Sequence, residues 1–158
     1  MKKIYKYKTE AFLKRGNIYN FKVIRKIFIP NDREYFVLEG LTGIKYLLPI
    51  EYYTNYNIKT NSEIECIVDK INCVGRIFLE PIHHYYKVNN SYEFKFISEI
   101  EIAKKNLIKQ KYYKLKGEYN FTALLSATYS INKFDIKQNK IFEIEKISKA
   151  TIFLKSPF

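Results

Sequence analysis

The chain has few side chains of the kinds that carry out catalysis, and their spacing suits neither a metal site nor a nucleophile. His83 and His84 are adjacent, and neighbouring residues of a strand point to opposite faces, so the pair cannot easily face one metal ion. Cys66 and Cys73 are seven positions apart, which is not a metal-ligand spacing. We interpret the histidines as packed or solvent-facing residues, and we expect no metal and no cofactor.

Catalytic motifs are also missing from the sequence. It contains no glycine-rich phosphate-binding loop, no nucleophile elbow and no pair of carboxylates at an interpretable spacing. The acidic residues are scattered among lysines. We therefore expect a protein that is not an enzyme, with a nuclease built from dispersed carboxylates left open as the alternative.

The net charge of +12 indicates an acidic partner such as nucleic acid. Of the 28 basic residues 24 are lysines, however, and a chain rich in Lys, Asn, Ile and Tyr also arises from compositional drift, so both interpretations stay open. Residues 1–15 carry six basic side chains and one acidic, residues 16–85 carry eight of each, and residues 86–158 carry fourteen and seven. The excess therefore lies in a basic N-terminal arm and in the second half.

A lysine-rich stretch in the second half has no acidic residue between Glu101 and Glu118. Tyr112 and Tyr113 are interleaved with its six lysines, among them Lys109 and Lys111. We predict that residues 104–116 form a loop, with room for a short helix, that clamps a nucleic-acid backbone. A solvated lysine-rich loop with no ligand is the alternative.

Two cysteines make no disulfide framework, and no apolar run approaches the length of a membrane span. The first 16 residues are basic but no continuous apolar stretch follows them, so they do not form a secretory signal. We expect a cytoplasmic protein with no membrane partner.

An internal repeat sets the architecture that must position these residues. Four blocks recur in the same order about 75 positions apart, which chance similarity does not explain. They are residues 19–24 with 92–97, 38–48 with 115–125, those ending at 71 with those ending at 147, and 77–81 with 152–157.

Period-2 alternation and turn residues predict five strands in the first half, at residues 17–28, 34–40, 43–48, 62–71 and 75–80. Pro49 ends the third strand, and residues 50–53 are predicted as a short helical turn. Because closure removes the exposed edges of so short a sheet, each half is expected to form a small barrel. We expect an arm over 1–15 and domains over 16–83 and 86–158.

Residues 16–81 resemble the S1-type RNA-binding domain, a variety of OB-fold barrel. The resemblance rests on residues 16–23, 35–49, 64–72 and 75–79, and the second half resembles the same pattern more faintly. The predicted fold is therefore all-β, with two tandem five-stranded OB-like (S1-like) barrels from an internal repeat.

The resemblance implies a face that binds single-stranded RNA. It places Tyr35 and Tyr46 as stacking aromatics, and Asn72 and Arg76 as the polar pair around the last hairpin. In the second half Tyr112 stands for Tyr35, but Ala123, Ser148 and Thr151 replace the other three. The family mode is therefore expected in the first domain.

Alternation adds Phe78, because inward Ile77 and Leu79 turn Arg76 and Phe78 outward together. Lys22 and Lys45 are predicted as strand cations that meet phosphates. Other roles stay open for these residues: Tyr35 as a cap on the core, Arg76 in an ion pair, and Phe78 with its counterpart Phe153 as packing between the barrels.

We predict a non-catalytic protein that binds single-stranded RNA in preference to DNA. The alternative is a protein–protein adaptor, or a small accessory subunit of a larger complex, in which the outward aromatics form the interface.

Overall fold

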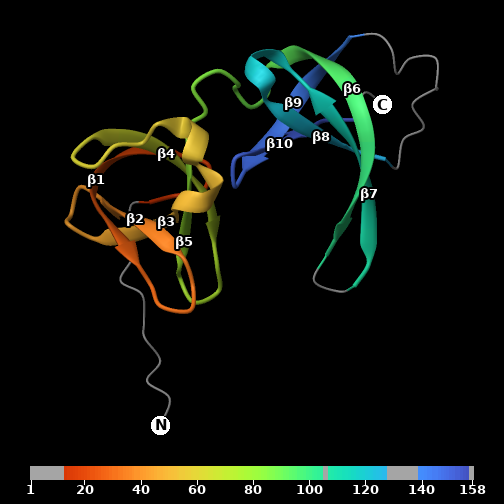
Figure 1. Ribbon diagram of the computed structural model, residues 1–158. Helices are drawn as coiled ribbons and strands as arrows, with labels where there is room; N and C mark the ends of the chain where they lie inside the picture. Colours follow the sequence, from red (N-terminus) through yellow and green to blue (C-terminus); the bar gives the residue numbers. More distant parts are fainter. Residues whose placement is uncertain (1–12, 105–106, 128–138, 157–158) are drawn as a thin grey trace. The chain divides into compact units, whose positions relative to one another are not determined.

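The computed structural model describes residues 13–104, 107–127 and 139–156, which form strands joined by turns and short 3-10 helices (Figure 1). The predicted basic arm lies largely outside these residues. The chain divides between His84 and Tyr85 into two compact units. In the described residues no helix has the length and apolar character needed to cross a bilayer.

Unit 1 is a five-stranded antiparallel sheet in the order β3-β2-β1-β4-β5. Its strands match the predicted ones to within two residues, and the helical turn predicted after Pro49 is confirmed. The elements are β1 (Ile18–Phe28), β2 (Glu34–Glu39), β3 (Lys45–Pro49), the 3-10 turns η1 (Ile50–Tyr52) and η2 (Thr54–Tyr56), β4 (Glu63–Ile71) and β5 (Ile77–Pro81).

Unit 2 closes into a barrel in the order β10-β8-β7-β6-β9, with β8 and β10 joined in parallel (Figure 1). Its elements are β6 (Ser91–Ala103), β7 (Lys109–Lys116), the 3-10 turn η3 (Glu118–Asn120), β8 (Thr122–Ser126), β9 (Lys140–Ser148) and β10 (Thr151–Leu154). Each strand of unit 2 has the neighbours of its counterpart in unit 1, and β8 and β10 are joined in addition, whereas β3 and β5 are the two edges of the sheet in unit 1. The repeat seen in the sequence is therefore a repeat of strand order. The predicted all-β fold with two five-stranded units is confirmed. The predicted closure into a barrel is seen in unit 2, whereas the strands described for unit 1 form an open sheet.

The structure corrects one element. The predicted loop over residues 104–116 is instead the second strand of the long β6–β7 hairpin, in which Lys109–Lys116 pairs with Lys95–Ala103. The many lysines among residues 109–116 obscure the alternation of polar and apolar residues that would predict a strand. Only Tyr113 and Leu115 alternate inward, and they pack on the core while the lysines face outward or lie beyond the barrel.

Alternation builds both cores. In unit 1 Phe21, Val23, Leu38, Leu48 and Val68 point inward and are almost fully buried. In unit 2 one inward row crosses the barrel through directly paired residues, and most of that row belongs to the core. The row consists of Phe96, Leu115, Ala123, Ile152 and Ile147. Because side chains alternate along each strand, the residues of the neighbouring row must point outward.

Candidate nucleic-acid interface

Tyr46 lies inside unit 1. It pairs directly with the buried Leu38 across β2 and β3, so both side chains point to the same face. Its ring is 8% exposed and meets the ring of Phe21 edge to face, with 5.6 Å between the ring centres. The predicted stacking role of Tyr46 is therefore wrong, because the ring is part of the core.

Tyr35 is also covered, although it points away from Leu38. Its ring is 7% exposed, and its hydroxyl donates a hydrogen bond of 2.7 Å to Oδ2 of Asp32. That hydrogen bond raises the pKa of Tyr35 and lowers the pKa of Asp32. The ring offers no open face to a base, and its predicted role as a stacking platform is corrected.

Asn72 and Arg76 flank the last hairpin as predicted, with different tasks. Oδ1 of Asn72 accepts hydrogen bonds from the backbone amides of Val74 (3.2 Å) and Arg76 (2.8 Å), which fixes the turn. The guanidinium carbon of Arg76 lies 4.9 Å from the centre of the Phe78 ring, which is 37% exposed. The predicted outward pairing of Arg76 and Phe78 is confirmed, and Asn72 serves the turn.

Lys22 and Lys45 are exposed, but acidic residues surround them. Glu39 pairs directly with both of them across β1, β2 and β3, and Glu63 pairs with Lys22 from β4. Opposite charges at directly paired positions attract each other. The two lysines therefore belong to a mixed-charge face.

Unit 2 carries a different outer surface. The row next to the inward one runs across all five strands through direct pairs: Ser98, Lys114, Leu124, Phe153 and Lys146. Further outward rows lie on either side: Lys95, Lys116 and Thr122, and then Ile100, Tyr112 and Ser126. We call these three rows the outer face of unit 2.

The centre of the outer face is aromatic. The half-buried rings of Tyr112 and Phe153 lie 6.4 Å apart at an interplanar angle of 64°. Nζ of Lys146 lies 4.9 Å from the centre of the Phe153 ring, the same arrangement that Arg76 makes with Phe78 in unit 1. The repeat has therefore kept an outward phenylalanine beneath a cation in both units.

The charge on the outer face is of one sign. Lys95, Lys114, Lys116 and Lys146 belong to its rows, and none of the residues in those rows is acidic. Glu93 and Glu145, which adjoin the face, lie outside the rows. Planar rings set among lysines suit a ligand that is both aromatic and anionic.

Lys109 and Lys111 do not join this face. Adjacent residues of β7 alternate, so both lysines lie on the side opposite Tyr112. Lys111 pairs directly with Glu101, and Nζ of Lys109 lies 4.0 Å from Oε2 of the same residue. Their predicted grouping with Tyr112 in one clamp is wrong, because a strand separates neighbours that a flexible loop would bring together.

The residues of the outer face that the sequence analysis did not include are Lys95, Lys146 and Phe153 in its outward position beside Tyr112. The outward position of Phe153 could have been predicted from the repeat, because the repeat aligns Phe153 with Phe78. The pairing of Lys146 with Phe153 depends on the register of β9 with β10. Comparison with protein-family models and with curated proteins finds no match.

Unit 1 also contains a buried polar cluster at the end of its chain. The hydroxyl of Tyr53 donates a hydrogen bond of 2.7 Å to Oε2 of the buried Glu80, and Nε2 of His84 lies 3.1 Å from the carbonyl oxygen of Tyr56. The His83 ring meets Tyr56 edge to face with 5.5 Å between the centres. Among the described residues, no three His, Cys, Asp or Glu side chains are grouped so that they could hold a metal ion.

This cluster is expected to make unit 1 less stable in acid. Burial and the neighbouring His84 lower the pKa of His83, which is 5% exposed, below its ordinary value of 6.5. Below pH 6.5 the unfolded state therefore binds more protons than the folded state, and stability is lost as the pH falls. We expect the amides of β4 and β5 to exchange with deuterium faster at pH 5 than at pH 7, after correction for intrinsic rates.

The variant His83→Gln is expected to lose most of this pH dependence, because its side chain does not titrate. An equal pH dependence in the variant would show that other groups cause the effect.

Proposed function

We propose that this chain is a non-catalytic protein that binds single-stranded nucleic acid, RNA in preference to DNA, on the outer face of unit 2. The observation that carries the proposal is the pair of rings, Tyr112 and Phe153, set among four lysines in rows without an acidic residue. A base stacked on an aromatic ring contributes about 1–3 kcal/mol with little sequence preference. The lysines supply attraction to the phosphates.

The contact between Lys146 and Phe153 indicates how a base would enter. Lys146 is exposed, and a solvent-exposed lysine over an aromatic ring is held by about 0.5–1 kcal/mol, while a stacked base supplies about 1–3 kcal/mol. A base can therefore replace the ammonium group on the ring. The freed ammonium group then lies close to the phosphate of that nucleotide.

The strand order supports the same face. OB-fold barrels bind oligonucleotides on the face of their second and third strands, which correspond to β7 and β8 here. The preference for RNA rests on the resemblance of residues 16–81 to the S1-type domain. Because Tyr35 and Tyr46 are buried, the proposal moves the bases from unit 1, where that resemblance is stronger, to unit 2.

Unit 1 supports a second candidate, a protein–protein adaptor. Its exposed apolar side chains include Phe28 (66%), Val74 (56%), Leu47 (38%) and Phe78 (37%). Residues 16–85 have no net charge, so a protein surface suits unit 1 better than a polyanion does. Binding of this kind would depend little on salt.

Salt dependence separates the two candidates. Four lysines that each neutralise a phosphate predict a slope of about −3 in a plot of log K against log salt concentration for a single strand. Fluorescence anisotropy with labelled oligo-U and oligo-dT at 50–300 mM KCl measures this slope. We expect Lys114→Gln with Lys146→Gln to make the slope shallower by about 1.4, because two phosphate contacts are lost.

The matched control is Lys109→Gln with Lys111→Gln, which removes the same charge from the opposite side of β7. If the control changes the slope as much as the test variant does, the net charge and not the outer face governs binding. Salt-independent or undetectable oligonucleotide binding would favour the adaptor.

A further inference from the structure

Lys95 and Lys116 form an unfavourable pair. They lie directly opposite each other across β6 and β7 at one end of the outer face. Like charges at directly paired positions of a sheet repel each other. Both lysines are exposed. An anion held between them would remove the repulsion.

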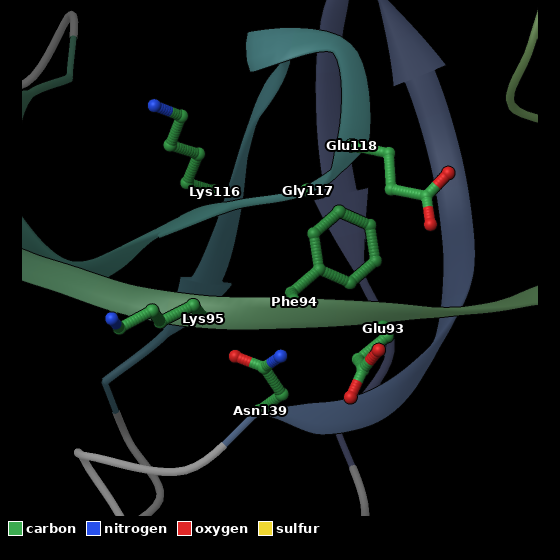
Figure 2. A pocket seen from close by; sticks show the side chains of 7 residues that line it. All are labelled: Glu93, Phe94, Lys95, Lys116, Gly117, Glu118 and Asn139. Atoms are coloured by element: carbon green, nitrogen blue, oxygen red, sulfur yellow. The ribbon is translucent and has the colours of Figure 1, made fainter.

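The two lysines line a pocket of about 300 Å³ (Figure 2). Gly117 and Asn139 also line the pocket, as does the ring of Phe94, which is 1% exposed. The backbone at Gly117 runs tightly over this ring, since a Cβ atom there would come within 2.9 Å of Cε1 of Phe94 and 2.2 Å of the Tyr86 hydroxyl. Gly117 and Phe94 therefore form one wall of the pocket.

Positive and negative side chains lie on different sides of the pocket. Figure 2 shows the ammonium groups of Lys95 and Lys116 on one side of the Phe94 ring and the carboxylates of Glu93 and Glu118 on the other. Oε2 of Glu118 accepts a hydrogen bond of 2.6 Å from the Tyr85 hydroxyl, which raises the pKa of Tyr85 to about 12. The carboxylate of Glu118 is thus directed to Tyr85 and away from the lysines.

We propose that the lysine side of this pocket binds the terminal phosphate of a nucleic-acid strand that lies on the outer face. The inference rests on the proposed function and adds the position of one strand end. A terminal phosphate carries a charge of about −1.5 to −2 at pH 7, which two lysines match, whereas an internal phosphodiester carries a single charge.

The test compares oligo-U of one length with a 5′-phosphate, with a 3′-phosphate, or with hydroxyl groups at both ends. We expect one of the phosphorylated forms to bind about tenfold more tightly than the hydroxyl form, as a charged contact of ordinary strength provides. Lys95→Gln with Lys116→Gln is expected to abolish this difference. Lys109→Gln with Lys111→Gln is the control that should retain it.

The outcomes separate the inference from the function on which it rests. Equal affinity for the three oligonucleotides overturns the terminal-phosphate site and leaves nucleic-acid binding in place. Absence of binding to all three overturns both. A phosphoserine peptide serves as the other source of a phosphate monoester. If it binds through Lys95 and Lys116 as tightly as the oligonucleotide does, the site does not recognise a strand end.

Discussion

Replacing both Tyr112 and Phe153 with alanine is expected to weaken oligo-U binding by at least about 30-fold, because two stacks of at least about 1 kcal/mol each are lost. The two rings lie 6.4 Å apart at the centre of the outer face, so one strand can contact both. Fluorescence anisotropy at a fixed low salt concentration measures the loss. The salt slope should stay close to that of the wild-type protein, because no lysine is removed.

Two further variants show whether stacking causes the loss. Phe153→Leu keeps an apolar side chain but removes the aromatic face, and it should lose most of what Phe153→Ala loses. Phe78→Ala removes the counterpart ring of unit 1 and should leave the affinity unchanged. If the Phe78 variant weakens binding as much as the Phe153 variant does, the bases lie on unit 1 and the proposed face is wrong. Thermal unfolding of each variant confirms that it is folded.

Tyr46→Ala is expected to destabilise unit 1 by about 3–5 kcal/mol, as truncation of a buried aromatic ring does. The ring is 8% exposed and packs on Phe21, so its loss leaves a cavity in the core. Urea unfolding, monitored by deuterium exchange of the β2 and β3 amides, measures this loss of stability within unit 1. Oligo-U affinity should not change under conditions in which the variant stays folded.

Phe28→Ala is the control for Tyr46→Ala. Its ring is 66% exposed, so truncation should change stability by no more than about 0.5 kcal/mol. A Tyr46→Ala protein with wild-type stability and weakened oligo-U binding would contradict the structure, because it would place the ring on an open binding surface.

The strands and the two-unit architecture could be predicted from the sequence, because alternation and turn residues are local signals. Tyr19, Phe21 and Val23 alternate with polar residues, and Pro49 ends its strand, so the strands of unit 1 were predicted to within two residues. The repeat in the sequence predicts two similar units. Burial of a ring depends on its neighbours across the sheet, which are far away in the sequence.

Two site predictions conflicted with alternation itself. Lys45 and Tyr46 are adjacent in β3, so they cannot both face solvent on one surface, and the pairing with Leu38 turns Tyr46 inward. Lys111 and Tyr112 are adjacent in β7 and separate in the same way. Had strand periodicity been applied to residues 109–116, it would have grouped Tyr112 with Lys114 and Lys116.

Other features of the site could not be predicted, because they depend on loops and registers. The hydrogen bond from Tyr35 to Asp32 requires the exact path of the β1–β2 loop. The row that joins Lys114 to Phe153 and Lys146 requires the parallel pairing of β8 with β10, in addition to the pairing of β10 with β9. Neither has a local sequence signature.

The most direct test of the central claim is a titration of the ¹⁵N-labelled protein with oligo-U, followed by amide chemical shifts. The proposed function predicts that the largest changes fall on β7, β8 and β10, around Tyr112, Lys114, Leu124 and Phe153, with small changes in unit 1. Changes confined to unit 1 around Arg76 and Phe78, or no changes at low salt, would contradict it.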